Sequence, residues 1–108
     1  MGHALVGTWQ FESMELWDRD AIDLLGPSFL TITSDGMGSF RFIAVEGQID
    51  CRFDERGDLP LVEFTWDGSD DGRPTSGRGW VRQDADATVV GRMFLHLADD
   101  SGFTLTRS

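Results

Sequence analysis

The stretch FLTITSDGMGSFRFIAVE, from Phe29 to Glu46, decides the fold of this 108-residue chain. Two runs rich in β-branched and aromatic residues, 29–33 and 39–46, flank the sequence SDGMG. An Asp-Gly pair between two such runs is a strong signal for a tight turn between antiparallel strands. We therefore predict a β-hairpin with Asp35 and Gly36 at its tip.

The same pattern continues on both sides of this hairpin. Short alternating runs, separated by turns rich in glycine and aspartate, predict six further strands. Their ranges are 6–16, 48–54, 61–67, 76–82, 88–97 and 103–107, and Gly47 is expected to form the turn before the fourth strand of the chain. An open meander of eight strands would leave two long edges, which closure into a barrel removes. The sequence predicts an all-β, eight-stranded, antiparallel up-and-down barrel that forms a single domain over residues 1–108.

The segment ELWDRDAIDLLGPSF, from Glu15 to Phe29, departs from the strand pattern. Asp18 or Asp20 can cap a helix, Gly26 fits its C-terminal end, and Pro27 prevents continuation. An apolar face can form from Trp17, Ala21, Ile22, Leu24 and Leu25. We expect a two-turn helix between the first two strands, folded over one mouth of the barrel. The alternative of a metal site is weaker, because the segment lacks the glycine and terminal glutamate of a calcium loop.

The charge of the chain limits its partners. The net charge is −10, and such a surface repels phosphate backbones and anionic lipid, so neither nucleic acid nor a membrane is an expected partner. All nine basic residues are arginine, and the absence of lysine excludes Schiff-base chemistry and a Walker-type lysine. No nucleophile elbow, metal-ligand set or dinucleotide fingerprint is present, so we predict no cofactor, no metal and no assigned catalytic residue.

Three further features favour a cytoplasmic location. No apolar run approaches the roughly 20 residues of a membrane span. The chain does not start like a signal peptide. The single Cys51 cannot form an internal disulfide, which agrees with a reducing compartment.

The first predicted strand contains VGTWQF, with Gly7 and Trp9, and the penultimate residue of the chain is Arg107. A Gly-x-Trp on the first strand, with an arginine from the last strand over the indole, resembles the signature of lipocalins and the wider calycin group. The resemblance implies a calycin-like barrel in which Trp9 plugs one end. Arg107 would cover the indole by cation–π stacking, because the first and last strands are neighbours in a closed barrel.

The chain as a whole also resembles a group of short bacterial proteins without an assigned activity. The matching stretches are ELWDRDAIDLLGP (15–27), FRFIAVEGQIDC (40–51), VEFTWDG (62–68), SGRGW (76–80) and FLHLADDSGF (94–103). This resemblance implies a bacterial origin and no particular reaction.

An eight-stranded barrel can hold side chains or one small ligand in its interior. Alternation places Phe11, Ser13 and Glu15 on the same side as Trp9, and aromatic residues on later strands form the natural core. The inward parity of 76–82 and 88–97 stays open. The candidate ligand site combines the apolar residues Trp9, Phe11, Phe42, Phe64 and Trp66 with the polar anchors Glu15, Arg78 and His96.

Each polar candidate has a simpler structural reading. A bulge at the end of the first strand would turn Glu15 to solvent. His96 could be a structural histidine, since a lone histidine is rarely catalytic without a partner. Arg78 could belong to cross-strand pairs on the outer face, together with Arg41, Glu63 and Arg92.

Three functions follow. The preferred one is a protein that binds a small apolar or aromatic molecule in the lumen, under the helix. The first alternative is an enzyme, such as an isomerase or cyclase, that uses Glu15 or His96 for proton transfer; whether any reaction is catalysed stays open. The second alternative is a filled barrel whose outer face, with Trp80 and Phe94, contacts a partner or forms a homodimer.

Overall fold

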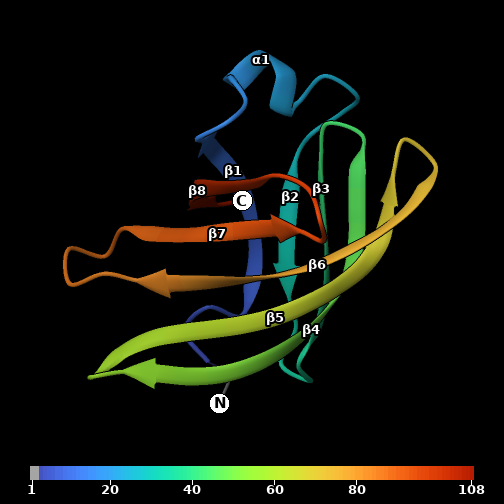
Figure 1. Cartoon of the computed structure of the whole chain (residues 1–108). Helices are drawn as coiled ribbons and strands as arrows, with labels where there is room; N and C mark the ends of the chain where they lie inside the picture. Colours follow the sequence, from blue (N-terminus) through green and yellow to red (C-terminus); the bar gives the residue numbers. More distant parts are fainter. Residues whose placement is uncertain (1–2) are drawn as a thin grey trace.

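The computed structural model describes residues 3–108 as a closed barrel of eight antiparallel strands in sequence order, which confirms the predicted fold (Figure 1). Strands β1 and β8 close the barrel, with Trp9 paired to Arg107. The elements are β1 (Gly7–Met14), α1 (Arg19–Ile22), β2 (Phe29–Ile32), β3 (Met37–Phe42), β4 (Val45–Arg56), β5 (Leu59–Asp70), β6 (Arg73–Gln83), β7 (Val89–Leu95) and β8 (Asp100–Arg107).

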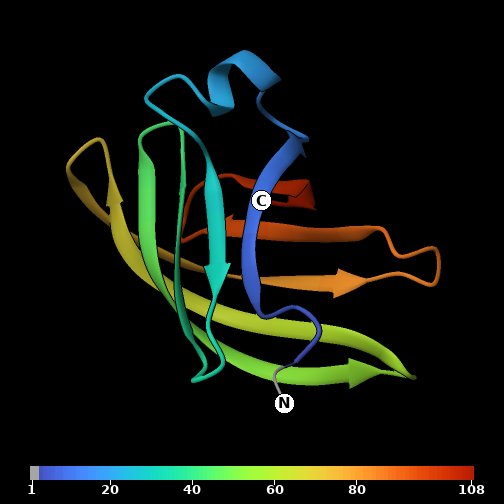
Figure 2. The ribbon, with the colours of Figure 1, turned by 180° about the vertical axis from the view of Figure 1, so that it is seen from behind.

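The strands are unequal in length, and this shapes the molecule. Strands β4 and β5 have 12 residues each and β6 has 11, whereas β2 has four. The β4–β5 and β6–β7 hairpins therefore extend to one side beyond the shorter strands, and α1 lies at the top of the barrel in Figure 1, away from their tips (Figures 1 and 2). The long central strands give the outer surface a broad face formed by β4 to β7.

The predicted hairpin of β2 and β3 is confirmed. The N–H of Gly36 donates to the carbonyl of Thr33 at 3.1 Å, and Gly36 has the positive φ of 83° that suits glycine. The carboxylate of Asp35 accepts from the hydroxyl of Thr33 and from the N–H of Met37. These bonds lower the pKa of Asp35 from its ordinary value.

The next turn lies elsewhere than expected. Gly47 does not form a turn but lies within β4, where a Cβ would be 2.8 Å from the ring of Trp66 and 2.9 Å from that of Phe40. The chain turns instead at Ile43 and Ala44, and Ile43 adopts a φ of 53°. A β-branched residue rarely adopts this conformation, so turn rules based on glycine could not find it.

The helix α1 is shorter than predicted. Asp18 caps it as expected, its carboxylate accepting from the N–H of Ala21 at 3.0 Å, but the helix has only four residues. Ile22 is buried and its carbonyl accepts the N–H of Ile43 at 2.9 Å, which ties α1 to the β3–β4 turn. Leu24 and Leu25 were expected on the buried face and are exposed instead, because the helix ends before them.

A bulge in β1 resets the alternation of that strand. Phe11 pairs with Leu105, and Ser13 pairs with the next residue, Thr104, so Glu12 is an extra residue. The bulge turns Met14 inward, where it pairs with Phe103. The side chain of Arg19 donates to the carbonyls of Phe11 and Glu12, which satisfies the acceptors that the bulge leaves.

Candidate functional site

The five apolar residues predicted for the ligand site, Trp9, Phe11, Phe42, Phe64 and Trp66, all lie buried inside the barrel. Their rings contact one another and their neighbours. Phe11 lies 5.6 Å from Phe42 between ring centroids, and Phe40 bridges Phe42 at 5.9 Å and Trp66 at 5.0 Å. Edge-to-face and offset contacts at these distances are favourable aromatic packing, so these residues form a continuous core.

Glycines on the inner face make room for these rings. A Cβ at Gly79 would lie 2.5 Å from the ring of Phe64, and one at Gly91 would lie 2.5 Å from Phe103. In the same way, a Cβ at Gly77 would lie 2.6 Å from the Nε1 atom of Trp66. Side chains of the protein itself therefore occupy the space that these glycines leave.

One end of the barrel is plugged as the resemblance to calycins implies. The indole N–H of Trp9 donates to the carbonyl of Leu5 at 3.0 Å, and the guanidinium of Arg107 lies 4.0 Å above its ring. Arg107 also donates to the carbonyls of Val6 and Ala4, each at 2.8 Å. The closed eight-stranded barrel with this contact is compatible with a calycin-like fold.

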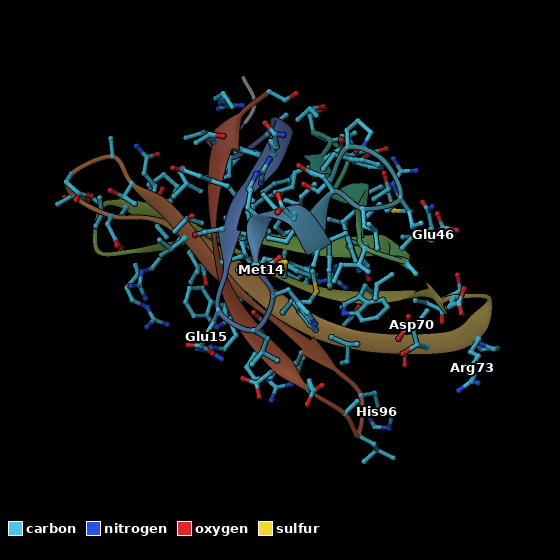
Figure 3. The ribbon with its side chains drawn as sticks, turned by 90° about the horizontal axis from the view of Figure 1, so that it is seen from above. Met14, Glu15, Glu46, Asp70, Arg73 and His96 are labelled. Atoms are coloured by element: carbon cyan, nitrogen blue, oxygen red, sulfur yellow. The ribbon has the colours of Figure 1, made fainter. Side chains whose placement is uncertain are left out.

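Glu15 does not face the interior, and its predicted role as an inward anchor is corrected. The bulge at Glu12 reverses the parity of the following residues, so Met14 points inward and Glu15 outward (Figure 3). The side chain of Glu15 is 57% exposed and lies 3.4 Å from Arg92, which also pairs with Asp100 at 2.5 Å. Hydrogen bonds to Asp100, and then to Glu15, raise the pKa of Arg92, which keeps the guanidinium charged.

Arg78 and His96 also lie outside, so the predicted lumen is not lined by its three polar anchors. Gly77 and Gly79 take the inward positions of β6, which turns Arg78 to the outer face. His96 is exposed in the turn that joins β7 to β8 (Figure 3). The N–H of His96 donates to the carbonyl of Ser76 at 2.8 Å, which holds this turn against β6.

The outer face carries a groove of about 550 Å³ instead. The floor is β5, with Leu61, Glu63 and Thr65, and the walls are β4 and β6. We call it the arginine groove, because its walls include Arg52, Arg56, Arg78 and Arg82, together with Trp80. Four of the nine arginines of an acidic chain therefore lie along one hollow, beside two carboxylates, Asp50 and Glu63.

Some of these arginines are paired within the protein and some are not. Arg52 pairs with Asp50 at 2.6 Å, and Arg82 pairs with Asp84 at 2.7 Å. Within residues 3–108, no carboxylate forms an ion pair with Arg56 or Arg78. A stacked guanidinium keeps its N–H edge available for a carboxylate, and Arg78 lies 4.3 Å above the ring of Phe94.

A second hollow, of about 350 Å³, adjoins the arginine groove and shares Thr65 and Arg78 with it. Ser76, Gly77 and His96 also line it, and its two large apolar side chains are Phe94 and Leu97. We call it the apolar hollow, after these two residues. The two hollows follow one another across the outer faces of β5 and β6.

Other reactive groups in the described part of the chain do not converge on these hollows. Burial raises the pKa of the Cys51 thiol to about 11, and Cys51 faces the core. Residues 3–108 contain no group of three or more histidine, cysteine or acidic side chains arranged for a metal ion. In the same range, no helix is long and apolar enough to span a membrane.

Comparison of the chain with protein-family models, with curated proteins and with solved structures found no match. The case for a function therefore depends on the geometry of the chain itself.

Sequence reasoning anticipated only part of the outer site. It named Trp80 and Phe94 as a partner surface and Glu63 and Arg78 as outer-face pairs, but it did not identify Arg52, Arg56 and Arg82 as neighbours. The signal was present in the alternation of β4 to β6, since residues of outward parity on adjacent strands lie side by side. Combining the strands required the register, which pairs Arg52 with Glu63 and Glu63 with Trp80.

Proposed function

We propose that this barrel is an interaction module that binds a short acidic segment of a partner protein in the arginine groove. The observation that carries the proposal is the concentration of four arginines, against two carboxylates, in one groove of a chain with a net charge of −10. Arginine presents a planar set of N–H donors that matches a carboxylate in a bidentate manner. Arg56 and Arg78, which form no ion pair within residues 3–108, would supply the first of these contacts.

The interior offers less support for the alternative, a small apolar ligand in the lumen. Rings of the core fill the space above the inward-facing glycines, and the three polar anchors expected there lie outside. A small-molecule site usually buries most of its ligand. The side chains that line the arginine groove are mostly exposed, so an extended segment lying along it is a better match than a compact molecule.

Charge also favours a peptide over two other anionic partners. A nucleic acid would bring many phosphates against the acidic surface around the groove, which would repel it. A second copy of the chain carries the same net charge of −10 and is repelled for the same reason. A short segment with a few carboxylates can reach the arginines while keeping the rest of its partner away from this surface.

The test is the binding of fluorescein-labelled hexaglutamate, followed by fluorescence anisotropy at low and at physiological salt. We expect Arg78→Gln to weaken binding about fivefold to tenfold, the range for one charge-assisted hydrogen-bonding side chain at an exposed site. Arg73→Gln is the matched control, because Arg73 is an exposed arginine at the other end of β6, near the β5–β6 turn (Figure 3). Its binding should stay within about twofold of the parent protein.

Three results would overturn the proposal. The first is the absence of binding up to millimolar peptide, and the second is an equal effect of Arg73→Gln and Arg78→Gln. The third is a stable homodimer, seen by size exclusion with light scattering, that Arg78→Gln dissociates, because the groove would then serve a second copy of the chain. Circular dichroism of both variants would establish that the barrel is folded in each case.

A further inference from the structure

The apolar hollow beside the arginine groove bears on which segments the groove can select, and this inference rests on the proposed function. The hollow begins where the groove ends, since Thr65 and Arg78 line both. Part of the lining changes at this boundary. Phe94 and Leu97 line only the hollow, together with Ser76 and His96, whereas Arg52, Arg56 and Arg82 line only the groove. Arg78 lies between the two, with its guanidinium over the ring of Phe94.

Leu97 is the most unusual residue of this surface. It lies in the β7–β8 turn, the residue is 94% exposed, and its φ is 59°. Asparagine or glycine adopts this conformation more readily, and water is a poor surrounding for a leucine side chain. The turn is nevertheless well fixed, because the N–H of His96 donates to Ser76 and that of Ala98 donates to Leu95 at 3.0 Å. An exposed leucine is thus held at the rim of the hollow.

The two hollows together have the length of a short extended segment. The floor of the groove covers the five residues of β5 from Leu61 to Thr65, and Asp67, the partner of Ser76, lies two residues further. The six steps along the strand from Leu61 to Asp67 span about 20 Å, at roughly 3.3 Å per residue. An extended peptide of about six residues can therefore contact both hollows at once.

We propose that the partner segment is bipartite: about six extended residues, whose acidic side chains meet the arginine groove and whose terminal apolar side chain enters the apolar hollow against Phe94 and Leu97. The acidic part supplies charge complementarity. The apolar part fixes the orientation of the segment along the two hollows. It also selects this segment over a purely acidic one, which would leave Leu97 exposed to water. Burying one such side chain against two others is worth about tenfold in affinity.

The experiment uses labelled pentaglutamate peptides that carry a leucine at the N-terminal or the C-terminal end, with matched peptides that carry serine in its place. Binding is measured by anisotropy with the whole protein and with Leu97→Asn, a substitution that tolerates a positive φ. We expect one of the two leucine peptides to bind about tenfold more tightly than its serine match. With Leu97→Asn the difference should fall below about threefold, and the serine peptides should bind as before.

The outcomes separate the two proposals. If the serine peptides bind, and Arg78→Gln weakens them, but neither leucine peptide gains, the bipartite partner is wrong and the proposed function stands. An equal loss for leucine and serine peptides with Leu97→Asn also contradicts the bipartite partner. If no peptide binds, both proposals are wrong.

Discussion

The inner and outer faces of β5 and β6 alternate residue by residue and follow different rules. On the inner face the ring of Phe64 packs on Gly79, and no space remains for a single methyl group. On the outer face Glu63 lies beside Trp80, and Arg78, one position after an inward glycine, is exposed and stacks on Phe94. The space available determines which residues the inner face accepts, whereas charged side chains characterise the outer face. Residues that stability does not dictate are the better place to look for function.

The largest loss of stability is expected from adding a single methyl group on the inner face. Gly79→Ala places a Cβ 2.5 Å from Phe64 and 2.6 Å from the backbone carbonyl of Arg92, which cannot move aside without disturbing the β6–β7 ladder. We expect the free energy of unfolding to fall by about 3 kcal/mol or more, as measured by urea denaturation.

The control is one residue away on the other face. Arg78→Ala removes more atoms but only one exposed cation–π contact, so the loss should stay within about 1 kcal/mol. If Arg78→Ala destabilises the barrel as much as Gly79→Ala, the contrast between the two faces is wrong.

The inner face and the strand order could be predicted from the sequence because their signals are local. The Asp35-Gly36 turn, the alternation of apolar residues, and the pair of Trp9 and Arg107 each follow from neighbouring residues or from closure of the barrel. Aromatic residues of one parity were expected inside, and the structure places Phe42 and Phe64 there.

The outer site could be predicted only in part, because its full composition depends on irregularities and on register. The extra residue at Glu12 turns Glu15 outward, as the bulge given as the alternative for this residue predicted, but no residue type marks the position of such a bulge. The turn at Ile43 is held by a hydrogen bond from Ile22 in α1, a tertiary contact that local turn rules do not include. The grouping of Arg52 with Arg78 needed the pairing of three strands.

A second prediction tests the inner face through pH. Burial raises the pKa of Cys51 from 9.0 to about 11. A raised pKa means that the thiol favours the folded state fully below pH 9, and that this contribution is lost as the pH rises from 9 to 11. The chain has no lysine and no tyrosine, so Cys51 is the one side chain whose ordinary pKa falls in this window.

We therefore expect the parent protein to lose on the order of 2 kcal/mol of unfolding free energy between pH 8.5 and pH 11, and the loss should be steepest near the middle of this pH range. Cys51→Ala is less stable at pH 8.5 but should lose far less over the same range. Parallel pH profiles for the two proteins would contradict the burial of a neutral thiol.

A third prediction concerns the end of the barrel at which Arg107 covers Trp9. Arg107→Ala removes the guanidinium over Trp9 and two hydrogen bonds to backbone carbonyls, and it exposes the indole. We expect a loss of about 1–2 kcal/mol by urea denaturation, with a red shift of tryptophan fluorescence. Arg73→Ala, at an exposed site, should change neither quantity. An equal effect of the two substitutions would show that Arg107 does not stabilise this end of the barrel.

The smallest effect is expected at Glu15, which the bulge in β1 turns to solvent, as the structural alternative for this residue predicted. Its carboxylate is more than half exposed and lies 3.4 Å from Arg92, whereas Asp100 binds the same guanidinium at 2.5 Å. Glu15→Gln therefore leaves Arg92 paired, and the free energy of unfolding should change by less than about 0.5 kcal/mol. Asp100→Asn removes the closer partner and should cost more. A double-mutant cycle of Glu15→Gln and Asp100→Asn measures how the two carboxylates share Arg92. A loss above about 1 kcal/mol for Glu15→Gln alone would show that this outer residue contributes to stability as core residues do. A position on the outer face would then not be enough to conclude that a residue serves binding rather than stability.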